Sequence, residues 1–566
     1  MTSPPDAPNL AGAFRMEVHD FFTAIDWVVV FAYLGLTTLV GHRMRGKQAS
    51  IHDFFLGGRS LPWQAVSGSI IATEISGVTF IGVPGMLFAL HGDFTYLQWA
   101  IGSIMARILV GLYFVRVYYE QDIYSPYDYM GRRLGNPAKV LATVIFTLGS
   151  ILAQSVRVLV AAIPLRVVTG MPMWLCILAI GLFAIGWTLM GGMRTVIWTD
   201  VMQFFLFTFG GIFAFFWIVA SLGGGFSEFW ETASQFGRTR MFDLSIQRDL
   251  QFTLWVAIFA VPFQNLGIFG TDQLMAQRMF CCRNSHEASK AIVFSSVGQI
   301  VTLTMLFVGA ALFVYYHNNP FTDSELTTVF DVSAGEVASV RENAVFAENP
   351  VTHETSNVIV PGEHDYVFPM WIVSVLPVGL SGLILAGVFA AAISSLDSIL
   401  AALSQTTLSL IYHPERGNLK IGERELLQRS RLLVVIWGLV LTGFTFLLNF
   451  IRKDIPILPL AFGMTSYTVG PMLAIFLSAM WGKGSVRGLL IGTLGSFVLV
   501  LFVRTDIWVL VMKAGLISPG TLASLWTYEL AGEGIRSTIS FVWMWPLTTI
   551  FTFACGMIPA GGKKQG

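Results

Sequence analysis

Four ionisable side chains stand inside long apolar stretches of the sequence. They are Glu74, Arg157, Asp200 and Asp397. A charged group at membrane depth is costly, and such groups mark binding sites, ion pathways or internal ion pairs. We therefore treat these four residues as candidates for binding an ion or a solute.

Hydroxyl groups surround the last of these acids. The run Ala390-Ala-Ala-Ile-Ser-Ser-Leu-Asp-Ser398 places Ser394, Ser395 and Ser398 within little more than one helical turn. Hard cations prefer several oxygen ligands, which hydroxyls and the carbonyls of an unwound helix can supply. Small residues also serve helix–helix packing in membranes. The run therefore indicates either a cation site or a packing seam.

The guanidinium of Arg157 needs a partner, because a buried charge is stable only when it is paired. One alternative is an internal pair with Glu74 or Asp397. The other is a carboxylate or phosphate on a bound solute, held by two parallel hydrogen bonds. Arg107 lies in a different apolar stretch and is a candidate structural partner of an acid.

The composition requires a membrane around these residues. The chain has 566 residues, of which 54% are hydrophobic and 12% charged, and its formal net charge is zero. Soluble domains carry about 25% charged residues. The composition excludes a cytosolic enzyme, a secreted disulfide scaffold and a disordered protein, and it argues against nucleic-acid binding.

Histidine and cysteine give no sign of catalysis or of a metal site. The nine histidines are scattered, and none makes a pair with metal-ligand spacing. The four cysteines, Cys176, Cys281, Cys282 and Cys555, also lack metal-ligand spacing, and we assign them neither a disulfide nor a metal. The sequence therefore predicts that the protein is not an enzyme.

Thirteen apolar segments are long enough to be transmembrane helices, which need about 20 residues. They lie near 24–42, 63–90, 97–118, 138–168, 171–190, 196–222, 250–270, 290–316, 367–410, 432–450, 455–480, 486–503 and 538–558.

Lysine and arginine predict the orientation, since they concentrate in cytoplasmic loops. With the N-terminus outside, the inner connections hold 21 of these residues and the outer segments hold 11. This arrangement makes 1–23 an extracellular segment, 318–366 an extracellular loop and 559–566 a cytoplasmic tail. The short loops suit a bacterial inner membrane.

Glycine and proline interrupt two of the segments. Ser76–Gly85 and Val261–Gly270 lie five spans apart, so they cross the membrane in opposite directions. Transporters with inverted repeats place their ligands between two such broken helices. We expect a first repeat over 63–222 and a second over 250–480. The segment 24–42 precedes the repeats, and two additional helices within 486–558 follow them.

Six short motifs in order resemble those of the sodium/solute symporter family. They are Phe54–Trp63, Ser76–Gly85, Tyr124–Gly135, Gly191–Gln203, Thr271–Arg278 and Ser394–Ser398, and they span about residues 50–480. The resemblance implies a LeuT-type inverted repeat with 13 or 14 helices. It also implies sodium-coupled transport of a solute such as a sugar, proline, iodide, a monocarboxylate, a vitamin or sialic acid.

The resemblance also implies residues for the main sodium site. The family uses carbonyls of the broken helix, here those of Ala72 and Ile75. It completes the site with a carbonyl and two hydroxyls of the serine helix, here Ala391, Ser394 and Ser395.

Some relatives bind a second sodium, for which the matching residues are Asp200, Ser394 and Ser398. Asp397 stands where many relatives have a smaller, uncharged residue, and it either strengthens that site or replaces one of its ligands. Glu74 matches a sodium-linked Asp of the proline carriers, which implies that it holds the ion or a substrate ammonium. Whether one or two sodium ions bind stays open.

For the solute, the pattern is most similar to the bacterial sodium/sialic acid branch. That branch implies contacts from Ser76 and Thr79 on the broken helix, Phe94 and Gln98 on the next helix, and Arg157 on the one after.

Two departures from the pattern of the sugar carriers also favour the sialic acid branch. Thr79 replaces their glutamine and Ile268 replaces their gating tyrosine, whereas Asn265 is retained and can bond a solute hydroxyl. Glu74 in turn departs from the sialic acid pattern.

The sequence thus predicts an all-α polytopic membrane protein of about 13 transmembrane helices. As a sodium/solute symporter it is expected to import a small organic solute that carries a carboxylate, such as sialic acid, a monocarboxylate or a sugar acid, by alternating access. Sodium is the expected coupling ion, and the lipid bilayer is its surroundings. The alternatives are a carrier of a neutral sugar or amino acid, and a nutrient sensor that does not transport.

Overall fold

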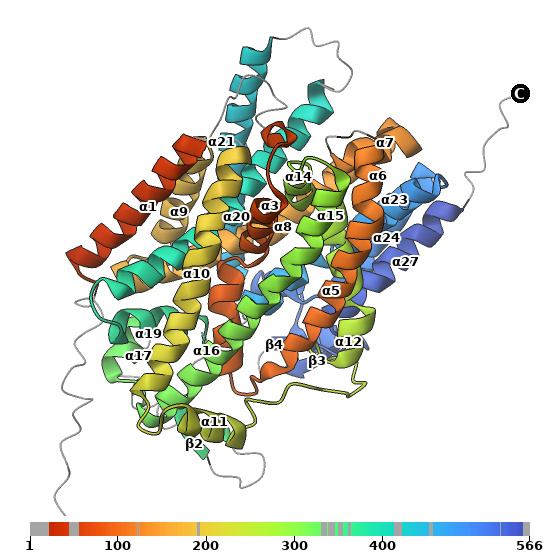
Figure 1. The fold of residues 1–566 in the computed structure, drawn as a ribbon. Helices are drawn as coiled ribbons and strands as arrows, with labels where there is room; N and C mark the ends of the chain where they lie inside the picture. The colour runs from red at the N-terminus through yellow and green to blue at the C-terminus, as the bar shows by residue number, and fades with distance from the viewer. Residues whose placement is uncertain are drawn as a thin grey trace, which may run out of the picture.

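The computed structural model describes residues 22–44, 56–121, 123, 125–189, 193–329, 337, 346–348, 355–359, 364–412, 422–451, 457–531 and 534–558. In these residues helices pack side by side into one bundle, accompanied by two short antiparallel strand pairs (Figure 1). The predicted segment 1–23, apart from its last two residues, and the predicted tail 559–566 lie outside the described residues.

The first part of the bundle runs to residue 235. Its helices are α1 (Ala24–Met44), α3 (Trp63–Glu74), η4 (Val78–Gly82), α4 (Val83–Phe88), η5 (Phe94–Gln98), α5 (Trp99–Leu109), η6 (Val110–Phe114), α6 (Val115–Glu120), α7 (Pro126–Leu134), α8 (Asn136–Thr169), α9 (Met173–Thr188), α10 (Met193–Ser221) and α11 (Gly225–Gln235).

The middle part runs from residue 254 to residue 481. Its elements are α12 (Leu254–Phe259), α13 (Val261–Asn265), η7 (Leu266–Thr271), α14 (Gln273–Met279), α15 (Ser285–Phe294), η8 (Ser295–Gly298), α16 (Gln299–Asn318), α17 (Asp323–Val329), β1 (Phe346–Glu348), β2 (Thr355–Ile359), η9 (His364–Tyr366), α19 (Val367–Val375), α20 (Leu380–Tyr412), α21 (Glu423–Ile451), α22 (Ile457–Thr465) and α23 (Val469–Trp481). The predicted loop 318–366 holds α17, β1 and β2 in its described parts.

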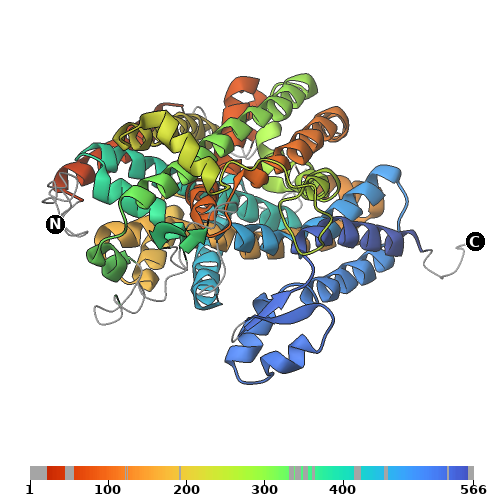
Figure 2. The same ribbon diagram turned by 90° about the horizontal axis from the view of Figure 1, so that it is seen from below.

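The last part lies at one edge of the bundle. It comprises α24 (Val486–Leu501), α25 (Asp506–Lys513), α26 (Pro519–Ala523), β3 (Tyr528–Ala531), β4 (Gly534–Ser537), η12 (Phe541–Trp543) and α27 (Met544–Met557). Figure 2 shows that the blue segment with α25, α26 and the β3–β4 pair stands apart from the bundle, whereas α27 packs on α23 and α24.

Nine helices of the described chain are long and apolar enough to cross a membrane, or up to eleven if each of two bent pairs counts as one span. The shorter apolar helices Met173–Thr188 and Phe541–Met557 coincide with two more predicted segments. Large apolar side chains face outward, for example Phe31 of α1 and Phe209 of α10, which are 64% exposed. Such a surface is stable only against lipid. The chain is a multi-pass membrane protein, and the count of thirteen helices stays a prediction.

The first predicted interruption is a break between α3 and η4. Ile75 leaves the helix with φ −80° and ψ 77°, and the two flanking helices are bent by 53°. A π-helical turn follows, and Pro84 then sits in the first turn of α4, where its missing N–H is not needed. The carbonyls before the break therefore lose the partners that a continuous helix would give them.

The second predicted interruption also contains a proline, a π-helical turn and a residue with a non-helical backbone, but in a different order. Pro262 lies in the first turn of α13, the π-helical turn η7 follows, and Asp272 is extended with φ −77° and ψ 131°. The carboxylate of Asp272 accepts a hydrogen bond of 2.8 Å from the N–H of Leu274 and so caps α14. π-helical turns such as η7 concentrate at functional sites.

Helix α20 lies at the centre and packs against α1, α8, α10 and α21. Its N-terminus is capped by Asp26 of α1, which accepts hydrogen bonds from the N–H groups of Gly379 and Gly382 and from the hydroxyl of Ser381. The first break lies directly against α20, because a Cβ on Gly77 would come within 3.4 Å of the Cβ of Ala392. The fold thereby brings the unwound backbone and the serine cluster together.

Candidate functional site

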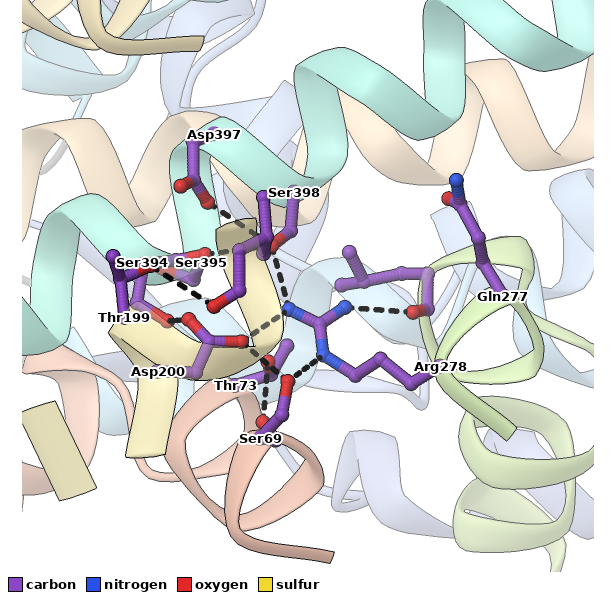
Figure 3. A network of polar contacts seen from close by, with 12 residues as sticks. Ser69, Thr73, Thr199, Asp200, Gln277, Arg278, Ser394, Ser395, Asp397 and Ser398 are labelled. Carbon is purple, nitrogen blue, oxygen red and sulfur yellow. Dashed lines mark hydrogen bonds and ion pairs between the residues drawn. The ribbon is translucent and has the colours of Figure 1, made fainter. Parts of the chain in front are cut away.

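A buried polar network joins α3, α10, α14 and α20 (Figure 3). The carboxylate of Asp200 lies at its centre and accepts hydrogen bonds from Ser69 and Ser394. It also forms an ion pair of 3.1 Å with Arg278. Asp200 and Arg278 are both fully buried, so bulk solvent does not screen their charges and each must be balanced by protein groups.

Arg278 is the residue of this network whose role the sequence analysis missed. Its guanidinium donates to Ser69 Oγ at 3.0 Å, to the Leu274 carbonyl at 2.8 Å and to Ser398 Oγ at 2.5 Å (Figure 3). The residues predicted for a second sodium, Asp200 and Ser398, thus already share a cationic partner. Arg278 ends the motif Thr271–Arg278, but its approach to α10 depends on the tertiary structure.

Asp397 has fewer hydrogen-bond and ion-pair partners than Asp200. It is 3% exposed and accepts a hydrogen bond of 3.0 Å from Ser398 Oγ. The same hydroxyl also points to the Ser394 carbonyl at 2.8 Å, and a hydroxyl has only one proton to donate. By formal charge, with both carboxylates ionised, the network of two acids and one guanidinium holds one negative charge in excess.

Asp397 also borders a cavity of its own. This cavity has a volume of about 100 Å³ and lies between α1, α9, α10, α20 and α21, with Thr37, Thr199 and Arg431 among its lining residues. None of the residues that line the central cavity described below lines it. Asp397 therefore lines a cavity that is separate from the central cavity.

The residues predicted for the main sodium site lie at the contact between the break and α20. Ala72 lies in the last turn of α3 and Ile75 follows its last residue, while Ala391, Ser394 and Ser395 are all buried on α20. Ser395 donates to the Ala392 carbonyl at 2.9 Å. Hydroxyl and carbonyl oxygens are the ligands that a hard cation requires, so the donor set fits sodium.

A central cavity of about 140 Å³ lies beside the two breaks. Of the residues predicted to contact the solute, Glu74, Ser76, Thr79 and Arg157 line it. Its wall also includes Tyr127, Ser150, Gln154, Gln264, Thr271, Asp272, Thr465 and Thr468, which the sequence analysis did not select. The cavity therefore combines charged, amide and hydroxyl groups.

Three predicted solute contacts do not line this cavity. Phe94 is fully buried against Phe307. Gln98 donates to the Phe252 carbonyl at 3.0 Å, and Asn265 accepts from Ser103 at 2.8 Å. The polar groups of Gln98 and Asn265 are engaged within the protein in this conformation.

Glu74 is paired with Arg107 and not with Arg157. The Arg107 guanidinium donates to the Glu74 carboxylate, donates to Ser103 at 2.7 Å and lies 4.3 Å from the ring centre of Phe269. Among the described residues Arg157 has no ion pair with Glu74 or Asp397. The two partners suggested for an internal pair of Arg157 are therefore not its partners in this structure, whereas Arg107 pairs with an acid, as expected.

Arg157 projects its charge to the cavity wall. Its guanidinium donates to the Thr73 carbonyl, at the end of α3, over 3.2 Å. No carboxylate of the described chain lies within 4.0 Å of it, although Asp272 shares the same cavity. The cavity thus presents a cation whose counter-ion the protein does not supply at contact distance.

Comparison with known proteins places the chain in a family. The model of the sodium:solute symporter family matches residues 54–495. The chain belongs to this family, whose members are transporters.

Several relatives match over most of their length. The sodium/glucose cotransporter of Vibrio parahaemolyticus is 27% identical over 84% of this chain and 84% of its own. The sodium/sialic acid symporter of Proteus mirabilis is 26% identical over 86% of this chain and 91% of its own. The human sodium-coupled monocarboxylate transporter 1 is 25% identical over 88% of this chain and 75% of its own.

A solved structure shares the fold. The substrate-bound, outward-open structure of a Na⁺-coupled sialic acid symporter aligns with a TM-score of 0.72 and 23% identity, over 95% of this chain and 97% of that one. The predicted fold class, an all-α polytopic protein of the LeuT type, is confirmed. The division into repeats over 63–222 and 250–480 stays a prediction.

Proposed function

We propose that the protein is a sodium-coupled symporter that imports a small organic solute bearing a carboxylate. The observation that carries this proposal is Arg157, which lines the central cavity without a carboxylate in contact. A desolvated guanidinium binds a carboxylate through two parallel hydrogen bonds. A solute anion is therefore the partner that this site lacks.

Sodium is proposed to bind where the first break meets α20. Its ligands are the carbonyls of Ala72 and Ile75, with the carbonyl of Ala391 and the hydroxyls of Ser394 and Ser395. A cation there holds the broken helix in one conformation, and the same helix carries Ser76 and Thr79 to the central cavity. Ion and solute thereby raise each other's affinity.

A second cation is proposed at Asp397, next to Asp200 and Ser398. The excess negative charge of the network supports it, because an uncompensated buried charge is costly. Arg278 fills the role of the cation between Asp200 and Ser398. The second cation therefore belongs on the Asp397 side, where the separate cavity opens.

The remaining predicted residues, Phe94, Gln98 and Asn265, are proposed to belong to the outer part of the solute path, which opens in another state of alternating access. Gln98 and its neighbour Trp99 bond to the carbonyls of Phe252 and Gln251, ahead of α12. With the N-terminus outside, these segments lie toward the outer face. Phe94, Gln98 and Asn265 are proposed to contact the solute when that side opens.

The proposed location is the plasma membrane, as in a bacterial inner membrane, with the C-terminus in the cytoplasm. The distribution of lysine and arginine supports this orientation. The membrane potential then adds about 2.3 kcal/mol per charge for each 100 mV. Inward movement of sodium supplies the free energy for import of the solute.

A neutral sugar is the second candidate solute. Asp272 lines the same cavity as Arg157, and a pair between them would leave the site without net charge. The similarity to a sodium/glucose cotransporter agrees with this alternative.

The deciding experiment is uptake into liposomes that contain the purified protein, with an inward sodium gradient. Each acid is tested beside its neutral amide. We expect sodium-dependent uptake of acids but not of amides, and loss of that uptake in Arg157→Ala. Arg116→Ala is the control, because Arg116 is an exposed cation with a 75% exposed side chain. Uptake of neutral sugars that survives Arg157→Ala would establish the second candidate, and solute binding without turnover would indicate a sensor.

A further inference from the structure

Two buried glutamines belong to the wall of the central cavity, and each carries one amide atom that has no partner. Gln154 lies on α8, one helical turn before Arg157, and its Oε1 accepts no hydrogen bond. Gln264 lies on α13, and its Oε1 accepts from Asn265 at 2.6 Å, which leaves its Nε2 without an acceptor. The two residues are 6% and 2% exposed.

Unpartnered amides of this kind are rare in folded proteins. The large majority of buried polar atoms have a hydrogen-bond partner, and leaving one without a partner costs about 1–3 kcal/mol. Here two such atoms belong to residues of the wall of one cavity, which Arg157 also lines. Their position indicates that a bound molecule supplies the missing partners.

The two amides differ in what they require. The Nε2 of Gln264 is a donor and suits any oxygen of the solute. The Oε1 of Gln154 is an acceptor and requires an O–H or N–H group. Asp272, also in the wall, is a second acceptor. A simple alkanoate offers no donor to either acceptor, whereas a hydroxylated acid does.

The volume of the cavity limits the size of the solute. A cavity of about 150 Å³ in another protein holds one benzene molecule, and the central cavity here measures about 140 Å³. A molecule of roughly six heavy atoms therefore fits this conformation.

We infer that the solute is a short hydroxylated carboxylate whose hydroxyl groups are recognised by Gln154 and Gln264. This inference rests on the proposed function, in which Arg157 holds the carboxylate. It adds two specificity residues on different helices, α8 and α13, so that hydroxyl recognition joins the two walls of the cavity.

The test compares three-carbon acids in the same liposomes. Propionate, lactate and glycerate carry no, one and two hydroxyl groups on one carbon skeleton, and alanine replaces the hydroxyl by an ammonium. We expect glycerate to be taken up best and propionate worst, with a difference in uptake efficiency of about 100-fold, since an analogue without a hydroxyl leaves the buried acceptors unpartnered. Uptake of sialic acid, a much larger acid, tests the limit on the size of the solute.

Substitutions assign the preference to its residues. Gln154→Leu and Gln264→Leu are each expected to reduce the ratio of glycerate to propionate uptake at least about tenfold, while sodium-dependent uptake of propionate persists. Gln203→Leu is the matched control, because Gln203 is 3% exposed and also has an unpartnered Oε1 but does not line the cavity. Its ratio should equal that of the unmodified protein.

Each contrary result has a separate meaning. Equal uptake of propionate and glycerate by the unmodified protein, or an unchanged ratio in both leucine variants, overturns the inference and leaves the carboxylate proposal in place. Preference for alanine assigns the acceptors to an ammonium and also overturns it. Uptake of sialic acid without uptake of any short acid refutes the size limit. Absence of sodium-dependent uptake of every acid contradicts the proposed function itself.

Discussion

Arg107 and Glu74 form an ion pair that joins α5 to the end of α3, immediately before the first break. The Arg107 side chain is fully buried and that of Glu74 is 23% exposed. Arg107 also lies over the ring of Phe269 in the second break. One guanidinium therefore connects both interrupted helices.

Breaking this pair should destabilise the protein. Arg107→Ala leaves the Glu74 carboxylate without its cation, and Glu74→Ala leaves a fully buried guanidinium, each at a cost of about 3–5 kcal/mol. Thermal unfolding in detergent measures the effect. The double variant Glu74→Gln with Arg107→Met should recover part of the loss, since neither unpaired charge then remains. If each single variant melts like the unmodified protein, the pair is not structural.

The serine hydroxyls of α20 should set the sodium affinity. Ser394→Ala or Ser395→Ala removes one proposed ligand oxygen, and we expect the sodium concentration for half-maximal uptake to rise about tenfold, equivalent to about 1.4 kcal/mol. Ser404→Ala is the matched control, because Ser404 is buried on the same helix and bonds to the Ser430 carbonyl at 2.8 Å. An equal effect of all three substitutions would mean that they act through helix packing.

Asp397 should determine the number of sodium ions transported. Asp397→Asn removes the excess negative charge of the network, so one cation fewer should move per solute. Reversal potentials of the solute-driven current, measured at several sodium gradients, give this stoichiometry directly. Asp249→Asn is the control, since Asp249 pairs with exposed Arg536 at 3.5 Å. An unchanged stoichiometry in Asp397→Asn would place the second cation elsewhere.

Gly102 should be needed for the contact between α5 and the segment before the second break. A Cβ at this position would lie 2.1 Å from the Ala257 carbonyl oxygen and 2.9 Å from the Cβ of Val261. We expect Gly102→Ala to cost about 1–3 kcal/mol of stability, through displacement of backbone. Gly186→Ala on α9 meets nothing within 4 Å and should leave the melting temperature unchanged. Equal melting temperatures for the two variants would refute the close approach.

Much of the fold could be predicted because its signals are local. Long apolar runs define the helices, and glycine and proline mark the breaks at Ser76–Gly85 and Val261–Gly270, where the structure has π-helical turns. The break and the serine helix, which carry the predicted sodium residues, each follow from a short motif, and the structure packs the two against each other. The sodium site itself stays a proposal. Arg157 lines the central cavity, and its role in binding a solute stays a proposal.

The sequence by itself determined the membrane setting, the helical segments and the family, since composition and motif order need no knowledge of distant contacts. Only the tertiary structure decided which charges meet. Arg107 rather than Arg157 pairs with Glu74, and Arg278 reaches Asp200 across 78 residues of chain. Side chains on different helices are brought together by packing, and the energy of a buried charge depends on atoms within a few ångströms. The unpartnered amides of Gln154 and Gln264 likewise became visible only once the cavity around them was formed.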